Sequence, residues 1–146
     1  MTRSARGAGQ TSRRSGPVAV PVVLTALALL VSAYVHSDLA DPPWSDDGQV
    51  TLAGLFLAQA VVSAAIGLWL LVRPGRLVLL AAGALALASL VGVLASYFVK
   101  IPSLGPLPAV YEPFWYTEKV VVLVAVGLAT ACTALALARQ RAGAPR

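Results

Sequence analysis

Four long apolar runs limit what this chain can fold into. They cover residues 17–35, 51–72, 77–99 and 120–138, and each is close to the roughly 20 residues that a helix needs to cross a bilayer core about 30 Å thick. The whole chain is 58% hydrophobic and 12% charged, whereas soluble domains average about 25% charged residues. We therefore predict an all-α fold, a four-helix transmembrane bundle formed by residues 17–138.

The charged residues lie at the ends of these runs. The tail 1–16, the turn 73–76 and the tail 139–146 contain only Arg as basic residues, and the other side of the bundle would carry Lys100 and Lys119. Because positive charge is retained in the cytoplasm, this asymmetry predicts a multi-pass plasma-membrane protein with both termini cytoplasmic. The net charge of +5 then reflects topology, and we predict no nucleic-acid partner.

The first apolar run has a second interpretation. A basic region, an apolar stretch and Val31-Ser32-Ala33 also form the pattern of a cleaved secretory signal. The run is longer than a typical signal core and three further spans follow it, which favours a retained helix. The tail 1–16 is rich in Arg, Ser and Gly and has no apolar face to bury, so we predict that it is disordered.

The stretch from Lys100 to Lys119 is apolar but cannot form one continuous helix, because it contains four prolines. Proline removes a backbone donor and stiffens the chain, and the aromatic residues of this stretch suit a membrane interface. We expect it to lie as a lid at the outer end of the bundle.

Small residues in the third run predict a helix-packing surface. Lipid tails are as apolar as leucine, so close backbone approach and interhelical hydrogen bonds stabilise helix pairs in a membrane. Small side chains recur every four residues along one stripe of this run, at Ala84, Ala88, Gly92 and Ser96. We predict that this stripe, and Gly92 above all, packs against another helix.

Two polar residues near the predicted outer end have alternative roles. Gln59 lies about eight residues into the second run, roughly 12 Å deep at helical rise, where it forms an interhelical hydrogen bond or lines a cavity. His36, the single histidine, is a pH sensor, proton acceptor or metal ligand, or an interfacial side chain bonded to backbone.

Glu112 and Glu118 flank the aromatic residues of the Lys100 to Lys119 stretch. Paired carboxylates serve acid–base chemistry or cation binding. In the alternative, Glu118 caps the fourth helix while the two lysines neutralise both carboxylates. The polar set most expected to converge at the outer mouth of the bundle is therefore His36, Gln59, Glu112 and Glu118.

Several activities are disfavoured by residues that the chain lacks. No acidic residue lies inside an apolar run, as a small multidrug antiporter would need. The single cysteine, Cys132, excludes a disulfide within the chain and a two-cysteine redox relay. One histidine does not supply the two axial ligands of a membrane b-type haem. We predict a non-enzymatic protein with no catalytic residues, no cofactor and no metal site.

Three short motifs resemble small four-helix membrane proteins of high-GC actinobacteria. They are Tyr34-Val35-His36, Leu55-Phe56-Leu57-Ala58-Gln59 and the glutamate that opens the fourth run, Glu118. In size and layout the chain is also similar to the four-helix DoxX-like proteins. The resemblance implies the fold and the membrane location, and it implies no activity.

The sequence leaves two functions open. The first is an accessory or interaction component that contacts another membrane protein or a second copy of itself. The contact surface would be Trp44 and the aromatic residues from Tyr111 to Tyr116. This aromatic patch is larger than membrane anchoring requires, which favours an interaction function. The second is a small permease or ligand-binding membrane protein that uses His36, Gln59, Glu112 and Glu118 around an outer-facing polar cavity. In both cases the lipid bilayer is a partner.

Overall fold

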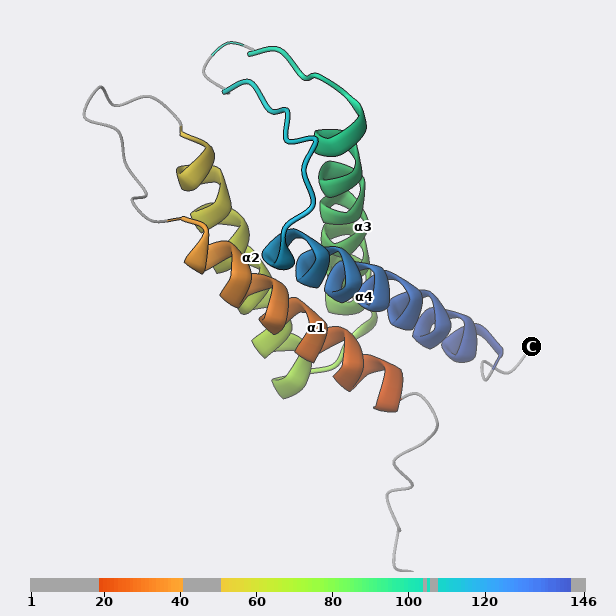
Figure 1. Ribbon diagram of the computed structural model, residues 1–146. Coiled ribbons are helices and arrows are strands. Elements are labelled where there is room, and N and C mark those ends of the chain that lie inside the picture. Colours follow the sequence, from red (N-terminus) through yellow and green to blue (C-terminus); the bar gives the residue numbers. More distant parts are fainter. Residues whose placement is uncertain (1–18, 41–50, 104, 106–107, 143–146) are drawn as a thin grey trace, which may run out of the picture.

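The computed structural model describes residues 19–40, 51–103, 105 and 108–142. The predictions for the tail 1–16 and for Trp44 lie outside these residues. The described chain forms four helices, α1 (Ala19–Asp38), α2 (Leu52–Val72), α3 (Arg76–Phe98) and α4 (Thr117–Ala142) (Figure 1). The all-α prediction is confirmed, and the only β-type pairing in the described residues is an isolated antiparallel bridge between Ile101 and Val110.

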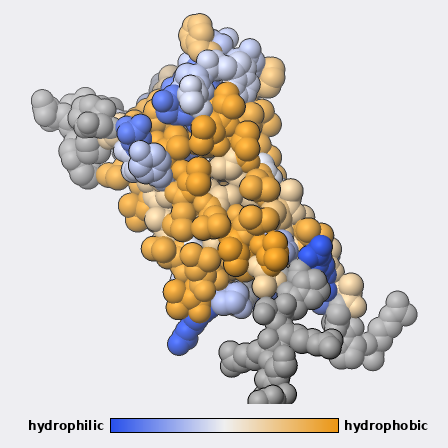
Figure 2. Space-filling view, turned by 60° about the horizontal axis from the view of Figure 1, so that its bottom comes forward, coloured by the Kyte–Doolittle hydropathy of each residue, from blue (hydrophilic) through white to orange (hydrophobic). Residues whose placement is uncertain are grey.

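All four helices are long and apolar enough to cross a membrane. Figure 2 shows an apolar surface across the middle of one face of the molecule, with hydrophilic residues at its two ends. Large apolar side chains are exposed on every helix, for example Val20 at 65%, Leu77 at 81% and Val124 at 63%. Exposure on this scale suits a lipid environment, because water would oppose it.

Local sequence signals set the helix ends. Pro21 lies in the first turn of α1, where a missing N–H is tolerated. The Thr51 hydroxyl caps α2 by accepting a hydrogen bond from the Gly54 N–H at 2.9 Å. Helix α4 begins three residues before the predicted run and continues four residues beyond it, to Ala142. Its last turn therefore carries Arg139 and Arg141, where cations interact favourably with the helix dipole.

The helices are arranged around α1 and α4 rather than as a square. Helix α1 packs along both α2 and α4, α4 also packs along α3, and α2 and α3 contact each other much less. Figure 1 shows α2 and α3 diverging from the short turn that joins them. We call the end with this turn the turn end, and the opposite end, where residues 99–116 connect α3 to α4, the segment end.

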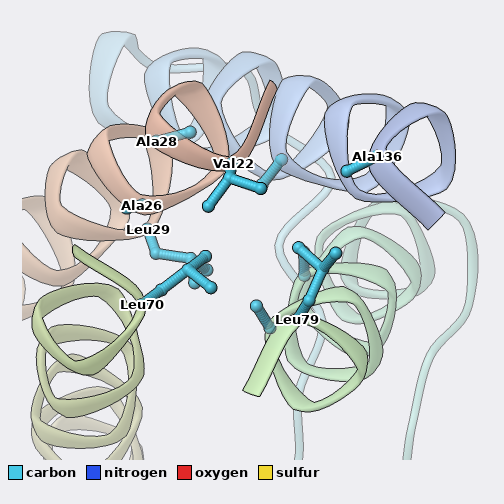
Figure 3. Packing of buried hydrophobic residues seen from close by; sticks show 10 residues of the cluster. Val22, Ala26, Ala28, Leu29, Leu70, Leu79 and Ala136 are labelled. Atoms are coloured by element: carbon cyan, nitrogen blue, oxygen red, sulfur yellow. The ribbon is translucent and has the colours of Figure 1, made fainter. Parts of the chain in front are cut away.

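The main apolar core lies toward the turn end. It combines side chains near the start of α1 and α3 with side chains near the end of α2 and α4 (Figure 3). Leu29, Leu70 and Leu79 are each 1% exposed and fill its centre, and most of the remaining members are alanines. Small residues let the helix backbones approach closely, which strengthens packing inside a bilayer.

A polar junction joins α1, α3 and α4 within this packing. The buried Thr25 hydroxyl donates to the Pro21 carbonyl at 2.9 Å. It therefore accepts from the Thr133 hydroxyl of α4, 3.4 Å away. The Thr133 side chain also lies against α3, where a Cβ added at Gly83 would meet Thr133 Cγ2 at 2.6 Å. The absence of a side chain at Gly83 is what allows α3 and α4 to approach here.

The predicted stripe does not form this contact, so the packing prediction for Gly92 is wrong within this chain. Ala84, Ala88 and Gly92 are exposed and only Ser96 is buried. A Cβ added at Gly92 would meet nothing within 4 Å. The packing face of α3 instead runs through Leu79, Ala82, Gly83 and Ala86. The reason is geometric: small residues occur on two faces of α3, and the divergence from α2 leaves the Gly92 face without a partner helix.

These two glycines give a direct test of the packing. We expect Gly83→Ala to lower the free energy of unfolding by about 1–3 kcal/mol, the usual cost of overpacking, because Thr133 is short, branched and buried. Gly92→Ala should cause no loss, because its methyl group enters open space. Thermal unfolding of both variants in the same detergent measures the difference. An equal loss in both would contradict the arrangement of α3 described above.

Candidate functional site

A pocket of about 320 Å³ lies at the segment end. Small-molecule sites usually occupy about 300–1,000 Å³ and are mostly apolar with a few polar groups. All four helices and the connecting segment contribute to the wall of this pocket. The lining residues are His36, Leu39, Leu52, Leu55, Phe56, Gln59, Ala88, Ser89, Gly92, Val93, Ser96, Val110, Glu112, Tyr116, Lys119 and Val122.

Gln59 joins the diverging helices α2 and α3 at this pocket. The Ser89 hydroxyl of α3 donates to the Leu85 carbonyl at 2.9 Å, so its oxygen is available to accept from Gln59 Nε2, with which it is hydrogen-bonded. Gln59 Nε2 also lies 3.4 Å from the Ser63 hydroxyl. The amide nitrogen is thus held by two hydroxyl groups. Gln59 both bridges the helices and lines the cavity, so its two predicted roles coexist.

His36 has a defined orientation. Its Nδ1 lies 2.8 Å from the Ser32 carbonyl oxygen, and because a carbonyl can only accept, Nδ1 carries the proton. In the neutral imidazole, Nε2 is then a hydrogen-bond acceptor. The ring packs edge-on against Phe56 of α2, with 5.6 Å between the ring centroids. His36 is 8% exposed, so the imidazole is fixed on both sides.

The outward-facing acceptor atoms of these two side chains reach open space. Neither His36 Nε2 nor Gln59 Oε1 has a hydrogen-bond partner among the described residues. No fully buried side-chain N or O atom in the described residues lacks a partner. Since both residues line the pocket, the space that the two acceptors meet is the pocket itself. The pocket therefore presents two unused acceptors within a largely apolar wall.

A buried lysine holds the connecting segment over the pocket. Lys119 is 4% exposed, and its Nζ donates to the Glu112 carbonyl at 2.6 Å and lies 3.7 Å from Glu112 Oε2. The ammonium is also within 6 Å of the Trp115 and Tyr116 ring centroids, a range that favours cation–π attraction. These contacts compensate the burial of the charge.

Tyr116 completes this anchor. Its hydroxyl donates to Glu112 Oε2 at 3.1 Å. Burial, followed by the neighbouring Glu112 carboxylate, raises the pKa of Tyr116 to about 12. The phenol therefore stays protonated, and remains a donor to Glu112, throughout the physiological pH range. Lys119 balances the charge of the Glu112 carboxylate and Tyr116 donates a hydrogen bond to it, which leaves no unbalanced charge in this part of the pocket wall.

The rest of the connecting segment is tied to itself and to α3. Ile101 and Val110 exchange two backbone hydrogen bonds, at 3.1 and 3.0 Å, and Gly105 between them has a φ of +59°, which favours glycine. The Glu112 N–H donates to the Ser96 carbonyl at 2.8 Å. Figure 1 shows the chain rising beyond α3 and descending to the start of α4. The segment thus returns toward the helices and forms part of the pocket wall.

The pocket brings together three of the four predicted polar residues: His36, Gln59 and Glu112. Glu118 lies in the first turn of α4 and does not line the pocket. From the predicted packing stripe, Ala88, Gly92 and Ser96 line the pocket and Ala84 does not. Their small size enlarges the cavity rather than tightening a helix contact.

The pocket also contains Ser89 and Tyr116, which sequence reasoning does not place there, and Lys119, which it offers only as one of two lysines that neutralise the carboxylates. The sequence predicts Lys119 as a counter-charge, and its burial follows from the Glu112 carbonyl and the two neighbouring rings. Lys119 follows Glu112 by seven residues, and this spacing predicts a contact between them only if the chain between them is known to bend. The Ser89 hydroxyl donates to its own helix at the Leu85 carbonyl, and it also accepts a hydrogen bond from Gln59 Nε2.

No group of three or more His, Cys, Asp or Glu side chains in the described part of the chain is placed to hold a metal ion. A second cavity, of about 310 Å³, lies at the turn end, is lined by residues of all four helices and has Gln140 of α4 as its one amide. It lacks the set of oriented acceptors found at the segment end. We therefore take the segment-end pocket as the candidate site.

Comparisons with protein-family models, with curated proteins and with solved structures find no match to this chain. The resemblance to small actinobacterial and DoxX-like four-helix proteins stays a prediction. Function has to be inferred from the pocket.

The lysine anchor can be tested with a matched pair of variants. We expect Lys119→Met to lower the free energy of unfolding by about 1–3 kcal/mol, because it leaves acceptors of Glu112 without their donor. Hydrogen exchange in residues 99–116 should also become faster. Lys100→Met is the control, because Lys100 is exposed at the other end of the same segment. Similar exchange rates in both variants would show that Lys119 does not hold the segment.

Proposed function

We propose that this protein is a multi-pass integral membrane protein that binds a small molecule in the segment-end pocket, as a binding protein or small permease rather than an enzyme. One observation carries the proposal: two oriented acceptors, His36 Nε2 and Gln59 Oε1, remain unused in an apolar pocket. Binding pockets are typically apolar with a few placed polar groups that orient the ligand. A ligand that donates hydrogen bonds to these two atoms would fit them.

The proposal is supported by the way each acceptor is fixed. His36 is held by Ser32 and Phe56, and Gln59 is held by two serines. Binding sites gain affinity when their polar groups are oriented before the ligand arrives. If the two side chains only joined helices, we would expect the remaining acceptor atom of each to form a hydrogen bond with a neighbouring helix.

A pocket-blocking variant tests this function. Gly92 lines the pocket and a Cβ there meets nothing within 4 Å, so Gly92→Leu should fill part of the cavity while the fold is retained. Gly127→Leu is the matched control, because Gly127 in α4 also faces open space but does not line the pocket. Both variants and the unchanged protein are purified from native membranes, and small molecules that co-purify are identified by mass spectrometry.

We expect one molecule to co-purify with the unchanged protein and with Gly127→Leu, in near-stoichiometric amount, and to be lost from Gly92→Leu. Absence of any such molecule from the unchanged protein would contradict the proposal. Retention by Gly92→Leu would place the ligand outside this pocket and would also contradict it.

The accessory function is the second candidate. Exposed aromatic side chains on the connecting segment favour it: Phe114 is 74% exposed and Tyr111 is 49% exposed. Trp115 stacks on Tyr97 at 4.8 Å between centroids and stays 43% exposed, whereas Tyr116 lines the pocket, so the patch is smaller than the sequence suggests by that one ring. A protein that co-purifies in stoichiometric amount in the same experiment, and is lost when Phe114 is changed to Ser, would support this candidate.

We also propose that the membrane is the plasma membrane, that both termini are cytoplasmic and that the segment end faces outward. Arg73, Arg76, Arg139 and Arg141 belong to the turn end, whereas Lys100 and Lys119 belong to the segment end. This distribution agrees with retention of positive charge in the cytoplasm.

A reporter fusion tests this orientation. Alkaline phosphatase is active only outside the cytoplasm, so a fusion after Arg146 should be inactive. A fluorescent protein at the same place should be bright. Changing the four Arg residues of the turn end to Asn should weaken the orientation bias. A phosphatase fusion that is active in the unchanged protein would overturn the proposed topology.

A further inference from the structure

We propose that the segment-end pocket takes an uncharged amphipathic lipid, with a hydroxyl or amide head group, and that this lipid enters sideways from the bilayer between α2 and α3. The inference rests on the proposed function and specifies its ligand class and its route of entry. It combines three features of the pocket: the small residues of one wall, the balanced charges of another, and the two free acceptors.

The route follows from how the two sides of the pocket differ. On the side of the connecting segment, the wall is fixed by the Ile101–Val110 bridge, the Glu112–Ser96 hydrogen bond and the contacts of Lys119. On the α3 side, Ala88 and Gly92 are exposed and have little side chain to close the gap. Helices α2 and α3 diverge toward this end (Figure 1). A ligand therefore meets the least obstruction between these helices on the segment side of the Gln59–Ser89 hydrogen bond, beside Gly92.

The charge of the ligand follows from the pocket wall. Lys119 is the cation of the wall and Glu112 the anion, and they are already paired with each other. An additional charge would lie in an apolar cavity without a counterion, which is strongly unfavourable. Among the remaining polar groups, the Tyr116 hydroxyl is engaged by Glu112 and the Ser89 hydroxyl by Leu85. The wall therefore favours an uncharged molecule.

The head group follows from the free atoms. His36 Nε2 and Gln59 Oε1 both accept hydrogen bonds, so the ligand has to donate. Gln59 lies one turn deeper in α2 than Phe56, against which the His36 ring packs, so the two acceptors are at neighbouring levels. A hydroxyl or amide group on an apolar body can reach this region while its apolar part contacts Leu55, Phe56 and Val93.

The first experiment tests the ligand class with defined probes. The full-length protein in phosphatidylcholine vesicles is exposed to a diazirine-bearing long-chain alcohol or to the carboxylic acid of the same chain, and the labelled peptides are identified by mass spectrometry. We expect the alcohol to label pocket peptides of α2 and α3 about fivefold more than the acid, the effect of about one or two neutral hydrogen bonds. Gln59→Leu should remove most of this excess, and Gln140→Leu, outside the pocket, should not.

Equal or stronger labelling by the acid would overturn the ligand class, and so would an excess that survives Gln59→Leu. Labelling of the pocket by neither probe, together with no co-purifying molecule, would contradict the proposed function as well. A co-purifying molecule that carries a net charge would retain the function and overturn this inference.

The second experiment tests the route. A nitroxide attached to Gly92→Cys, in a Cys132→Ala background, is examined by electron paramagnetic resonance with oxygen, which partitions into lipid, and with a water-soluble nickel chelate. We expect oxygen to relax the label more than the chelate, as on a lipid-facing surface. Phe98→Cys, at the end of α3 and exposed, is the comparison site nearer to water. Greater relaxation by the chelate at position 92 would show a water-filled entrance and would overturn the route.

Discussion

An irregular chain that returns among apolar helices needs hydrogen-bond partners for its N–H and C=O groups, because lipid offers none. The connecting segment meets this constraint with few contacts. Ile101 and Val110 exchange backbone hydrogen bonds. The Glu112 N–H donates to the Ser96 carbonyl, and the Glu112 carbonyl accepts from Lys119 Nζ. Lys119 is central, because its single ammonium satisfies a carbonyl, neutralises a carboxylate and contacts two rings. The position of the segment, and with it one wall of the pocket, depends on that buried charge.

The packing of the helices explains why the candidate site lies at the segment end of the bundle. Toward the turn end, Leu29, Leu70 and Leu79 fill the space between helices. Toward the segment end, α2 and α3 diverge, and the smaller cluster of Val35, Val122 and Val126 does not reach across the gap. The connecting segment forms part of the pocket wall at this end, and the Gln59–Ser89 hydrogen bond joins α2 and α3 across the gap. Both ends of the bundle hold a cavity, but the oriented acceptors line the one at the segment end, and the turn-end cavity has Gln140 as its one amide.

The sequence predicted the helices well because the relevant signal is local. Apolar runs of the right length, bounded by Pro74-Gly75 and by the charged ends, determine where a membrane helix begins and ends. It also found His36, Gln59 and Glu112, since polar residues near the ends of apolar runs are few. It offered Lys119 only as a counter-charge, because the hydrogen bond to the Glu112 carbonyl depends on how the chain bends between Glu112 and Thr117. That bend is a tertiary property, and no periodicity in the sequence encodes it.

Gly92 shows the limit of pattern reasoning most clearly. A stripe of small residues is compatible with two opposite arrangements: a helix that approaches closely, or a cavity that remains open. Residue identity cannot distinguish these two arrangements, since both need the side-chain volume that a small residue leaves free. At Gly83 a branched side chain from α4 occupies the volume. At Gly92 the neighbouring helix has diverged, so the volume remains empty beside Gln59. The deciding factor is the angle between α2 and α3, and this angle turns a predicted packing surface into the wall of a candidate binding site.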